Sequence, residues 1–404
     1  MKVKRLNADF GNSTNNFMAD GYYFELSTNV VEISEARANK MFVSFVSEPR
    51  ELLDRLMIST VIKGIEHYFL VGEIAELSKL SNNHVSEMHD KIKSNIPYVS
   101  FLGAVAYYSS LNSNKEDNQI EIEYMSTMLP IWLLKREEKF STAQRQMEAR
   151  FLGEHTVKVH TLGMEKEINI IVNNVKCRIE SEVSRHAIKY RMVTKDEAPN
   201  TIIIEKRNDM GFVNNAVVLV DIGGGSTDAV KLGKGLTAPQ SRDSFQVIDI
   251  EPFLGQLEKL RKEKLLEYFH DLHSLEKFII QSYKHQKYIF ANENNGQRND
   301  FTEQITEVLN EYSSTIVSKL LTSFKPEGSE VIKFIYFGGE SPILQEYIKS
   351  SLLNHMNEQF AKNNHLFLND IIIDDRNEVF KPTSRTINLT ALEILSINET
   401  KNLM

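Results

Sequence analysis

The sequence predicts an α/β protein built on a duplicated core. Short apolar runs that are typical of strands alternate with segments whose apolar residues recur at three- and four-residue steps, and this alternation indicates helices layered on sheets. Two apolar runs also end alike, each with an Asp (Asp9 or Asp221) followed two residues later by a Gly. We therefore expect two related halves, each of which supplies one turn.

The individual elements follow from these two periodicities. Apolar runs predict strands at Val3–Phe10, Tyr22–Leu26, Tyr68–Val71, Ile120–Tyr124, Thr156–Leu162, Ile168–Val172, Val175–Ile179, Ala216–Ile222 and Val331–Phe337. Helical spacing predicts helices over Lys135–Phe151, Glu251–Phe269 and Phe301–Phe324. The stretch Lys195–Asn215 indicates a domain boundary, because polar and turn-forming residues there precede a new buried strand.

Composition narrows the class of protein. A chain of 404 residues corresponds to two or three domains of roughly 150 residues each. The net charge of −8 argues against direct binding of nucleic acid, which calls for a concentrated basic surface. A single cysteine, Cys177, excludes an internal disulfide framework and a cysteine-cluster metal site, and fits a reducing cytoplasm. No apolar run approaches the ~18 residues that a membrane span needs, and no apolar segment typical of a secretory signal follows the basic N-terminus.

The first chemical motif is the strand and turn at residues 6–14. Its candidate residues are Asp9, Gly11, Asn12, Ser13 and Thr14. A glycine lets the backbone approach a phosphate closely, and the amides and hydroxyls that follow it are donors to phosphate oxygens. The Asp at the mouth of the turn can hold a magnesium ion through water, since Mg²⁺ favours one or two carboxylates beside the phosphates. Taken alone, the motif also fits a plain β-turn.

The second motif is more specific. Four consecutive aliphatic residues, Val217–Val220, precede the candidate residues Asp221, Gly223, Gly224, Gly225, Ser226 and Thr227. Three successive glycines cost conformational entropy, and close approach of backbone amides to a phosphate gives a reason for that cost. Asp221 precedes its glycines as Asp9 precedes Gly11. A structural Gly-rich hairpin is the alternative interpretation.

The third motif is a strand that runs into two glycines and then a helix start. Its candidate residues are Gly338, Gly339, Glu340 and Ser341, followed by Pro342 in the first helical turn. The bare glycines offer a flat surface against which an adenosine can lie. By itself the motif also fits an ordinary strand–helix junction.

Together, the order and spacing of the three motifs resemble the actin and Hsp70-type ATPase superfamily, with two phosphate loops followed by an adenosine loop. The resemblance implies an actin-like (ribonuclease H-like) two-domain α/β fold that binds ATP and magnesium in an interdomain cleft, with Asp9 and Asp221 near the metal. The sequence lacks the G-x-x-x-x-G-K-[ST] pattern of P-loop NTPases. The glycines of GGGST also lack the Rossmann spacing and its later ribose-binding acid.

Within this superfamily, the chain resembles the bacterial plasmid-segregation actins of the ParM type. Residues 120–136 resemble that family's strand and Leu-Pro turn, and residues 175–181 resemble the segment that carries its water-positioning glutamate. The resemblance places this role on Glu180, with Glu182 as the alternative, and makes Glu180 and Asp221 the expected catalytic residues. A solvated glutamate at a helix start is the competing interpretation of Glu180.

The resemblance also implies how the chain is divided. We expect residues 1–205 to form the first domain and residues 206–382 the second. Residues 383–396 resemble the family's helix that returns to the first domain, so 383–404 are assigned to it.

One position departs from the family pattern, and three lysines add little to it. The family commonly has a phosphate-contacting lysine seven residues after the Asp of the first loop, where this chain has Asn16. A basic residue from elsewhere can supply that contact, or nucleotide affinity and hydrolysis are altered. The lysines of a predicted helix where the family contacts adenosine are better explained as a solvated face: Lys277, Lys284 and Lys287.

The expected function is that of a polymerising ATPase. The resemblance implies head-to-tail filaments controlled by nucleotide, because a heterologous contact that does not close gives an open helix. It also implies a DNA-binding adaptor protein that links the filament to plasmid DNA, and the acidic charge agrees with an actin that touches the adaptor rather than the DNA.

The alternative is a small-molecule, sugar-type kinase of the same superfamily, in which a bound hydroxyl replaces the attacking water. ATP and GTP both fit these motifs. An ATP-driven chaperone is disfavoured because few residues follow the return helix.

Overall fold

The computed structural model describes residues 1–78, 90–112, 118–195, 198–207, 211–292, 295–326, 328, 330–372 and 377–402. Within these residues the chain forms two compact units. Unit 1 contains residues 1–78, 90–183 and 388–402, and unit 2 contains residues 184–387. The division expected at 205/206 differs from the boundary between the compact units, which lies at 183/184. Of the C-terminal segment assigned to the first domain (383–404), residues 388–402 lie in unit 1 and residues 383–387 lie in unit 2.

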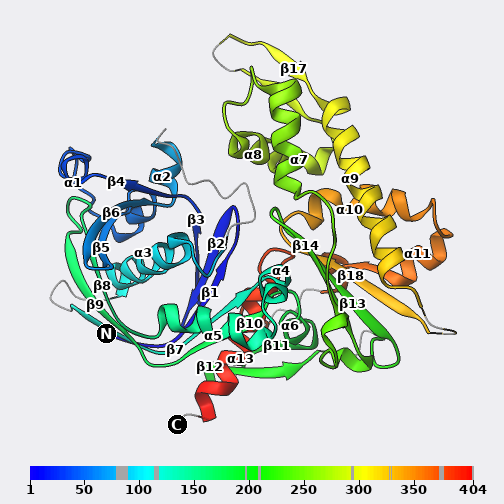
Figure 1. Cartoon of the computed structure of the whole chain (residues 1–404), viewed down its shortest axis with the longest axis horizontal. Helices are drawn as coiled ribbons and strands as arrows, with labels where there is room; N and C mark the ends of the chain where they lie inside the picture. Colours follow the sequence, from blue (N-terminus) through cyan, green and yellow to red (C-terminus); the bar gives the residue numbers. More distant parts are fainter. Residues whose placement is uncertain are drawn as a thin grey trace. The chain divides into compact units, whose positions relative to one another are not determined.

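Unit 1 is built on one large mixed sheet of ten strands (Figure 1). In sequence order these are β1 (Lys2–Phe10), β2 (Thr14–Ala19), β3 (Tyr22–Ser27), β4 (Val30–Ile33), β5 (Met57–Ile62), β6 (Ile65–Val71), β7 (Gln119–Leu129), β8 (Gly153–Val159), β9 (Lys166–Val172) and β10 (Val175–Ile179). The spatial order is β3-β2-β1-β7-β9-β8-β5-β6-β4, and β10 pairs with the second half of β7.

The helices of unit 1 pack on this sheet. They are α1 (Glu35–Ala38), α2 (Glu73–Leu77), α3 (Asn95–Asn112), α4 (Ile131–Arg136), α5 (Phe140–Phe151) and α13 (Ile387–Asn402). Helices α3 and α5 share one apolar core with the sheet, in which Phe101 and Phe151 meet edge to face. Helix α13 is held to β1 by polar contacts: Arg5 and Asn7 both bond the buried Glu393 carboxylate.

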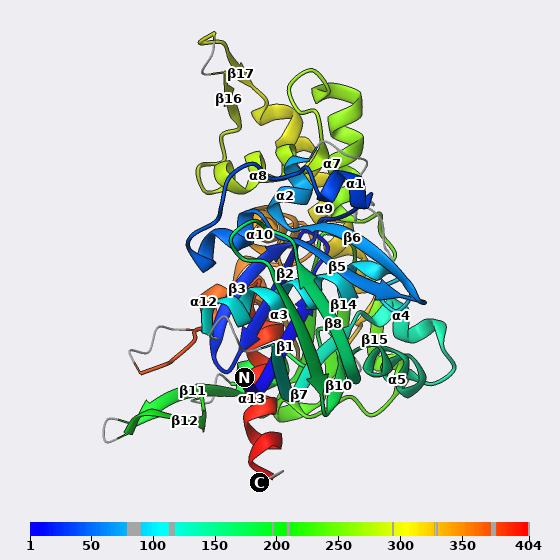
Figure 2. The ribbon, with the colours of Figure 1, turned by 90° about the vertical axis from the view of Figure 1, so that its left-hand side faces the viewer.

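Unit 2 is built on a five-stranded sheet, ordered β15-β14-β13-β18-β19 (Figure 1). Its strands are β13 (Ala216–Ile222), β14 (Thr227–Leu232), β15 (Phe245–Val247), β18 (Ile332–Phe337) and β19 (His365–Phe367). Two further pairs, β11 (Tyr190–Lys195) with β12 (Ala198–Lys206) and β16 (Ile289–Ala291) with β17 (Arg298–Asp300), form separate two-stranded ribbons (Figure 2).

The helices of unit 2 supply most of its core. They are α6 (Arg185–Lys189), α7 (Phe253–Leu260), α8 (Leu272–Ser282), α9 (Thr302–Ser323), α10 (Ser341–Leu352), α11 (Glu358–Asn364) and α12 (Leu368–Ile371). The buried faces of α7, α8, α9, α10 and α11, together with β13, β14 and β18, enclose one apolar cluster. The β11–β12 ribbon is linked to the rest of this unit by the ion pair between Arg207, which directly follows β12, and Glu378. In this pair Nη1 of Arg207 lies 3.0 Å from Oε2 of Glu378.

The two units repeat one arrangement of strands. In unit 1 the order β3-β2-β1-β7-β10 has two antiparallel pairs followed by two parallel pairs. In unit 2 the order β15-β14-β13-β18-β19 has the same pairs in the same sequence. The duplicated core predicted from the two similar turns is therefore confirmed.

Several predicted strands are longer or shorter than the observed ones, and three predicted elements are divided, change geometry or are displaced. The helix expected over Lys135–Phe151 is two helices. Glu137 and Lys139 are extended between them, and they belong to a wholly charged stretch (135–139) that has no apolar face to bury. The helix expected over Glu251–Phe269 leaves α geometry after Leu260 and continues as a wide π turn, Arg261–Leu265. The strand expected at Thr156–Leu162 lies at Gly153–Val159, where its pairing with β9 sets its bounds.

The described part of the chain has no helix that is both long and apolar enough to cross a bilayer.

Candidate functional site

The first predicted loop is the turn of the β1–β2 hairpin. The last residues of β1 are buried, and across the hairpin Asp9 faces Asn16 while Phe10 faces Asn15. Gly11 is required sterically, because an added Cβ would collide with the carbonyl oxygen of Thr14. Asp9 therefore lies at the end of a central strand, beside a turn that begins with a glycine.

The second predicted loop is the turn of the β13–β14 hairpin, and it has the same register. Asp221 faces Asp228, and Ile222 faces Thr227. A Cβ on Gly223 would lie 3.2 Å from the Ser226 carbonyl oxygen, which is the contact that Gly11 would make with Thr14. The two turns are thus equivalent parts of the duplicated fold.

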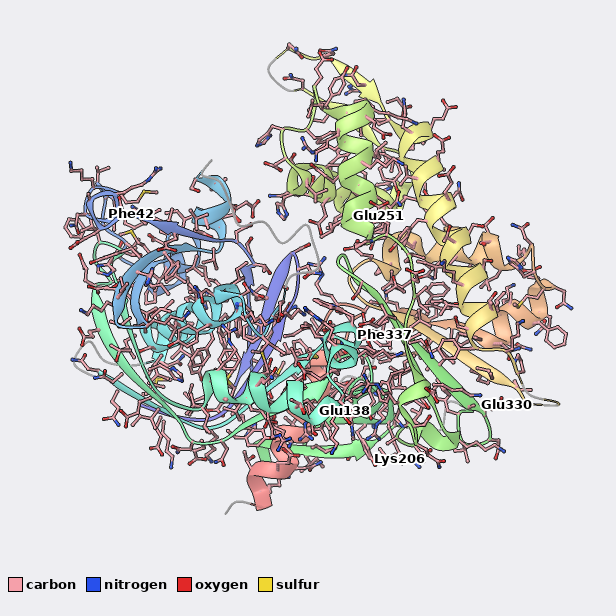
Figure 3. The ribbon with its side chains drawn as sticks, in the orientation of Figure 1. Phe42, Glu138, Lys206, Glu251, Glu330 and Phe337 are labelled. Atoms are coloured by element: carbon pink, nitrogen blue, oxygen red, sulfur yellow. The ribbon has the colours of Figure 1, made fainter. Side chains whose placement is uncertain are left out.

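The third predicted loop packs directly against the second. Gly338 follows Phe337 at the end of β18 (Figure 3), has a φ of +98°, and would place a Cβ 2.5 Å from Oδ1 of Asp221. The amide of Glu340 donates to the Ile222 carbonyl at 3.1 Å. Pro342 lies in the first turn of α10, as predicted. Unit 2 therefore brings Asp221, Gly223–Thr227 and Gly338–Ser341 to one end of its parallel strands.

The carboxyl of Glu340 is buried beside these glycines. Its Oε1 lies 3.4 Å from the place where a Cβ of Gly224 would be. Its Oε2 has no hydrogen-bond partner among the described residues. Burial, together with the negative charge of Glu276, raises the Glu340 pKa to about 8, against the opposing effect of Arg385. A buried polar atom without a partner, beside a backbone cradle of glycines, fits a polar ligand at this loop.

Glu180 lies at the corresponding end of the parallel strands in unit 1. It directly follows β10, and its amide donates to the Leu129 carbonyl at the end of β7, at 3.0 Å. Ser181 then takes a positive φ of 69° and turns the chain away. The carboxylate of Glu180 accepts from the ammonium of Lys91 at 3.4 Å. Glu182 lies in the same turn, and its amide donates to the Glu180 carbonyl.

Each unit thus gathers its own predicted residues at the carboxyl ends of its parallel strands, where α/β sheets commonly bind ligands. The turns supply amides and hydroxyls, and Asp9 and Asp221 supply the hard oxygen donors that Mg²⁺ prefers. Within the described residues, no three His, Cys, Asp or Glu side chains converge as a ready-made metal cluster.

The comparisons with known proteins identify the family. A family model described as the Alp7A C-terminal domain matches residues 216–371. The actin-like protein Alp7A, known from a crystal structure, is 43% identical to this chain. The match covers 100% of this chain and 98% of Alp7A, and the two structures superpose with a TM-score of 0.86. The chain belongs to the Alp7A family of actin-like proteins. A search of curated proteins found no match.

More distant structures share the fold of this family. A ParM of Bacillus thuringiensis with AMPPNP is 14% identical, with a TM-score of 0.61 over 98% of this chain and 99% of its own. A 15-stranded ParM filament from Clostridium botulinum is 15% identical, with a TM-score of 0.63 over 98% of this chain and 100% of the filament subunit. The predicted actin-like fold and the resemblance to segregation actins are both confirmed.

Sequence reasoning missed the residues that surround the predicted ones. Glu276 and Arg385 act on Glu340 from segments that are far from it in the chain, and Lys91 contacts Glu180 across 89 residues. No motif marks any of the three.

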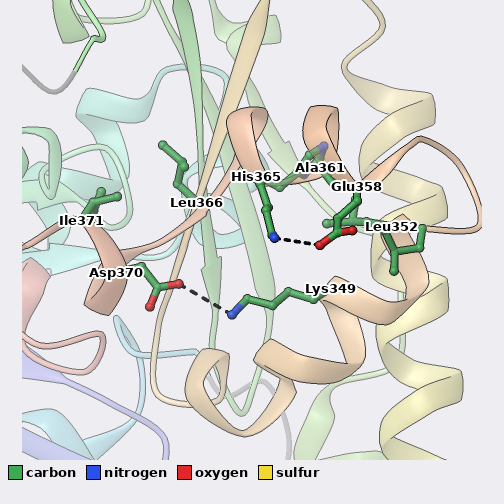
Figure 4. Close-up of a pocket in the computed structure, with 10 residues that line it drawn as sticks. Lys349, Leu352, Glu358, Ala361, His365, Leu366, Asp370 and Ile371 are labelled. Atoms are coloured by element: carbon green, nitrogen blue, oxygen red, sulfur yellow. Dashed lines mark ion pairs between the residues drawn. The ribbon is translucent and has the colours of Figure 1, made fainter.

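A separate pocket of about 420 Å³ lies in unit 2 between α10, α11, β19 and α12, and its lining contains none of the predicted site residues (Figure 4). Ion pairs join Lys349 to Asp370 and Lys362 to Glu358 in its wall.

Proposed function

We propose that this protein is an ATPase that assembles into filaments under the control of its bound nucleotide. The observation that carries the proposal is the 43% identity to an actin-like protein over the whole chain, together with two equivalent Asp–Gly hairpins of the kind that hold phosphates. The likeness to a ParM that forms filaments supports the polymerising role. Head-to-tail contacts between copies give such an open assembly.

The two hairpins are proposed to hold the phosphates of one ATP. In the first, the phosphate ligands are the backbone and hydroxyls of Gly11, Asn12, Ser13 and Thr14. In the second they are Gly223, Gly224, Gly225, Ser226 and Thr227. The loop Gly338–Ser341 receives the adenosine. A magnesium ion held by Asp9 and Asp221, largely through water, would neutralise charge on the phosphates.

Glu180 is proposed to orient the attacking water. It lies at the strand ends of unit 1, its side chain is 21% exposed, and its carboxylate is paired with the ammonium of Lys91. Positioning and electrostatics are the main means of catalysing phosphoryl transfer, and an oriented carboxylate serves both. Hydrolysis then changes the contacts that the loops make with the nucleotide, which is how ATP and ADP select different states.

The biological role proposed is segregation of plasmid DNA through a DNA-binding adaptor protein. The net charge of −8 supports an adaptor, because an acidic filament does not attract DNA by itself. The alternative, a small-molecule kinase of the same superfamily, is disfavoured by the match to Alp7A.

Light scattering and pelleting of the full chain test this proposal. We expect assembly with ATP and little with ADP. Asp221→Ala should abolish nucleotide-dependent assembly, whereas Asp243→Ala, at an exposed aspartate of the same unit, should leave it unchanged. Protein that stays monodisperse and consumes ATP only when a sugar is added would favour the kinase instead. Assembly and hydrolysis that survive Asp221→Ala would refute the assignment of the metal site.

A further inference from the structure

Lys91 is a buried lysine that precedes α3 in unit 1. Its side chain is 7% exposed, and its ammonium lies 3.4 Å from Oε2 of Glu180, whose side chain is 21% exposed. Removing an ammonium from water costs several kcal/mol unless a charge or hydrogen bonds replace the solvent. A lysine in this position therefore calls for a specific partner or task.

The strand register places this ion pair near the first phosphate loop. Strands β1, β7 and β10 are parallel neighbours; Asn7 pairs with Ser126 on β7, and Ile179 pairs with Leu129. By this register Asp9 is level with Arg178, and Glu180, which directly follows β10, lies two residues further along. Asp9 and Glu180 therefore lie at the same edge of the sheet, two strand spacings across and two residues along, or roughly 12 Å apart. Lys91 contacts Glu180 at that edge.

The first loop lacks a cation of its own. Residues 9–16 contain no Lys, Arg or His. Asn16, at the position where the family resemblance predicts a lysine, is buried, and its Oδ1 accepts from the Tyr23 hydroxyl at 3.0 Å. A triphosphate carries several negative charges, so this half of the site needs positive charge from another segment.

The surrounding structure fixes where the Lys91 side chain begins. From α5, Arg150 donates to the carbonyls of Ile92 and Ser94, the latter at 2.6 Å. The Asp90 carboxylate accepts from the amides of Ile92 and Lys93 at 3.1 and 3.2 Å. Helix α5 also holds β10, because Glu148 accepts from the Cys177 amide at 2.9 Å. One helix thus ties together the turn that carries Lys91 and the strand that leads to Glu180.

We propose that Lys91 supplies the positive charge of the phosphate site in unit 1 and acts as a positioning residue for Glu180. Its ammonium holds the Glu180 carboxylate in place and faces the terminal phosphate of a bound nucleoside triphosphate, in the role left open by Asn16. This inference rests on the proposed ATPase function. It assigns to Lys91 two effects that can be measured separately: alignment of the catalytic carboxylate and preference for ATP over ADP.

The test compares Lys91→Met with Lys93→Met in the full chain. Lys93 lies on the same turn, its side chain is 79% exposed, and its ion pair with Asp90 spans 3.8 Å. We expect Lys91→Met to lower kcat for ATP hydrolysis about 100-fold, the size of effect that misplacing a catalytic group produces. It should also weaken ATP binding about tenfold while changing ADP binding less than twofold, as expected for the loss of one charge-assisted hydrogen bond to the terminal phosphate. Lys93→Met should change none of these values more than twofold.

Two further variants separate this role from a structural one. Lys91→Arg keeps the charge and should retain most of the preference for ATP over ADP. The double variant Lys91→Met/Glu180→Gln removes both charges, so its thermal stability should stay close to that of the wild type, while its preference for ATP stays lost. A merely structural Lys91 would change the melting temperature but not the ratio of ATP to ADP affinity.

The outcomes distinguish this inference from the proposed function. If Asp221→Ala abolishes nucleotide binding but Lys91→Met leaves kcat and the affinity ratio within twofold of wild type, the role of Lys91 is refuted and the proposed function stands. A wild-type chain that binds no nucleotide overturns both.

Discussion

Asp9 and Asn16 face each other across the β1–β2 hairpin, at the register that Asp221 and Asp228 occupy in β13–β14. The position that the family resemblance assigns to a phosphate-contacting lysine therefore lies directly opposite the proposed metal-site carboxylate. In this chain it carries an uncharged amide that is hydrogen-bonded to Tyr23.

Restoring the lysine should make Lys91 less important. In an Asn16→Lys background, we expect ATP to bind about tenfold more tightly, the effect of one added charge-assisted contact. Lys91→Met should then cost less than threefold in ATP affinity instead of about tenfold. Titration calorimetry with ATP measures both values. The control is Asn118→Lys, which adds the same charge just before the first residue of β7, at the end of that strand away from the proposed site. An undiminished loss on removal of Lys91 would contradict the idea that the two cations serve one site.

Adjacent glycines of the third loop should respond very differently to an added methyl group. Gly338→Ala forces a Cβ into a backbone with a φ of +98° and within 2.5 Å of Asp221 Oδ1. We expect it to lower the free energy of unfolding by about 3 kcal/mol. At Gly339 the nearest atoms belong to Arg385 at 3.9 Å and beyond, so Gly339→Ala should stay within about 0.5 kcal/mol of wild type.

Urea denaturation measures the two stabilities, and ATP binding by Gly339→Ala tests the adenosine assignment. If adenosine lies flat on this loop, the added methyl group weakens ATP binding although the fold is intact. A Gly338→Ala protein as stable as wild type would show that the loop relaxes in a way these contacts do not predict.

Stability should fall as pH rises because of Glu340. Its pKa is raised by burial and by Glu276, and lowered by Arg385, to about 8 in the folded chain from about 4.5 when exposed. Below pH 4.5 the carboxyl is protonated in both the folded and the unfolded chain. Between pH 4.5 and 8 only the unfolded chain loses the proton, so this group removes up to ~1.4 kcal/mol of stability for each pH unit.

Replacing this carboxyl with an amide removes the titration. We expect Glu340→Gln to gain stability relative to wild type between pH 5 and pH 8, with little difference at pH 4.5. Urea unfolding at several pH values gives the two slopes. Parallel slopes for wild type and variant would mean that Glu340 is ionised in the folded protein.

The return helix α13 should depend on a buried ion pair. Glu393 is fully buried, accepts from Nη2 of Arg5 at 3.0 Å and from Nδ2 of Asn7 at 2.5 Å. Arg5→Met leaves this carboxylate without its cation, and we expect a loss of about 3 to 5 kcal/mol in the free energy of unfolding. Lys4→Met, at the exposed neighbouring position, should change it by less than about 0.5 kcal/mol.

A second change should recover much of that loss. Arg5→Met/Glu393→Leu replaces the pair with apolar side chains, and such replacements of buried ion pairs are often neutral or stabilising. Thermal unfolding of the wild type, the two single variants Arg5→Met and Glu393→Leu, and the double variant gives the coupling energy between the two side chains. Additive effects of the two changes would show that the pair does not anchor α13.

The elements predicted well are those whose burial is determined locally. The strands expected at Val175–Ile179 and Ala216–Ile222 have the observed bounds. Val175–Ile179 alternates apolar and charged residues, which is the strand period, and Ala216–Ile222 is a nearly continuous apolar run that a central parallel strand buries on both faces. Helix α9 was predicted within a residue at each end, since its apolar residues keep one face along its length. Helix α3 was missed because apolar residues cover it on nearly all sides, and this leaves no amphipathic stripe to detect.

The sequence by itself determined the α/β class, the two equivalent turns and the order of the three glycine loops, because each is written in a short stretch of neighbouring residues. Only the tertiary structure decided which charges those loops meet. Lys91 reaches Glu180 across 89 residues, Arg5 reaches Glu393 across 388, and Glu276 and Arg385 set the protonation of Glu340 from other elements. Burial and ion pairing arise from segments that are distant in the chain, so their energies depend on how the sheets and helices pack.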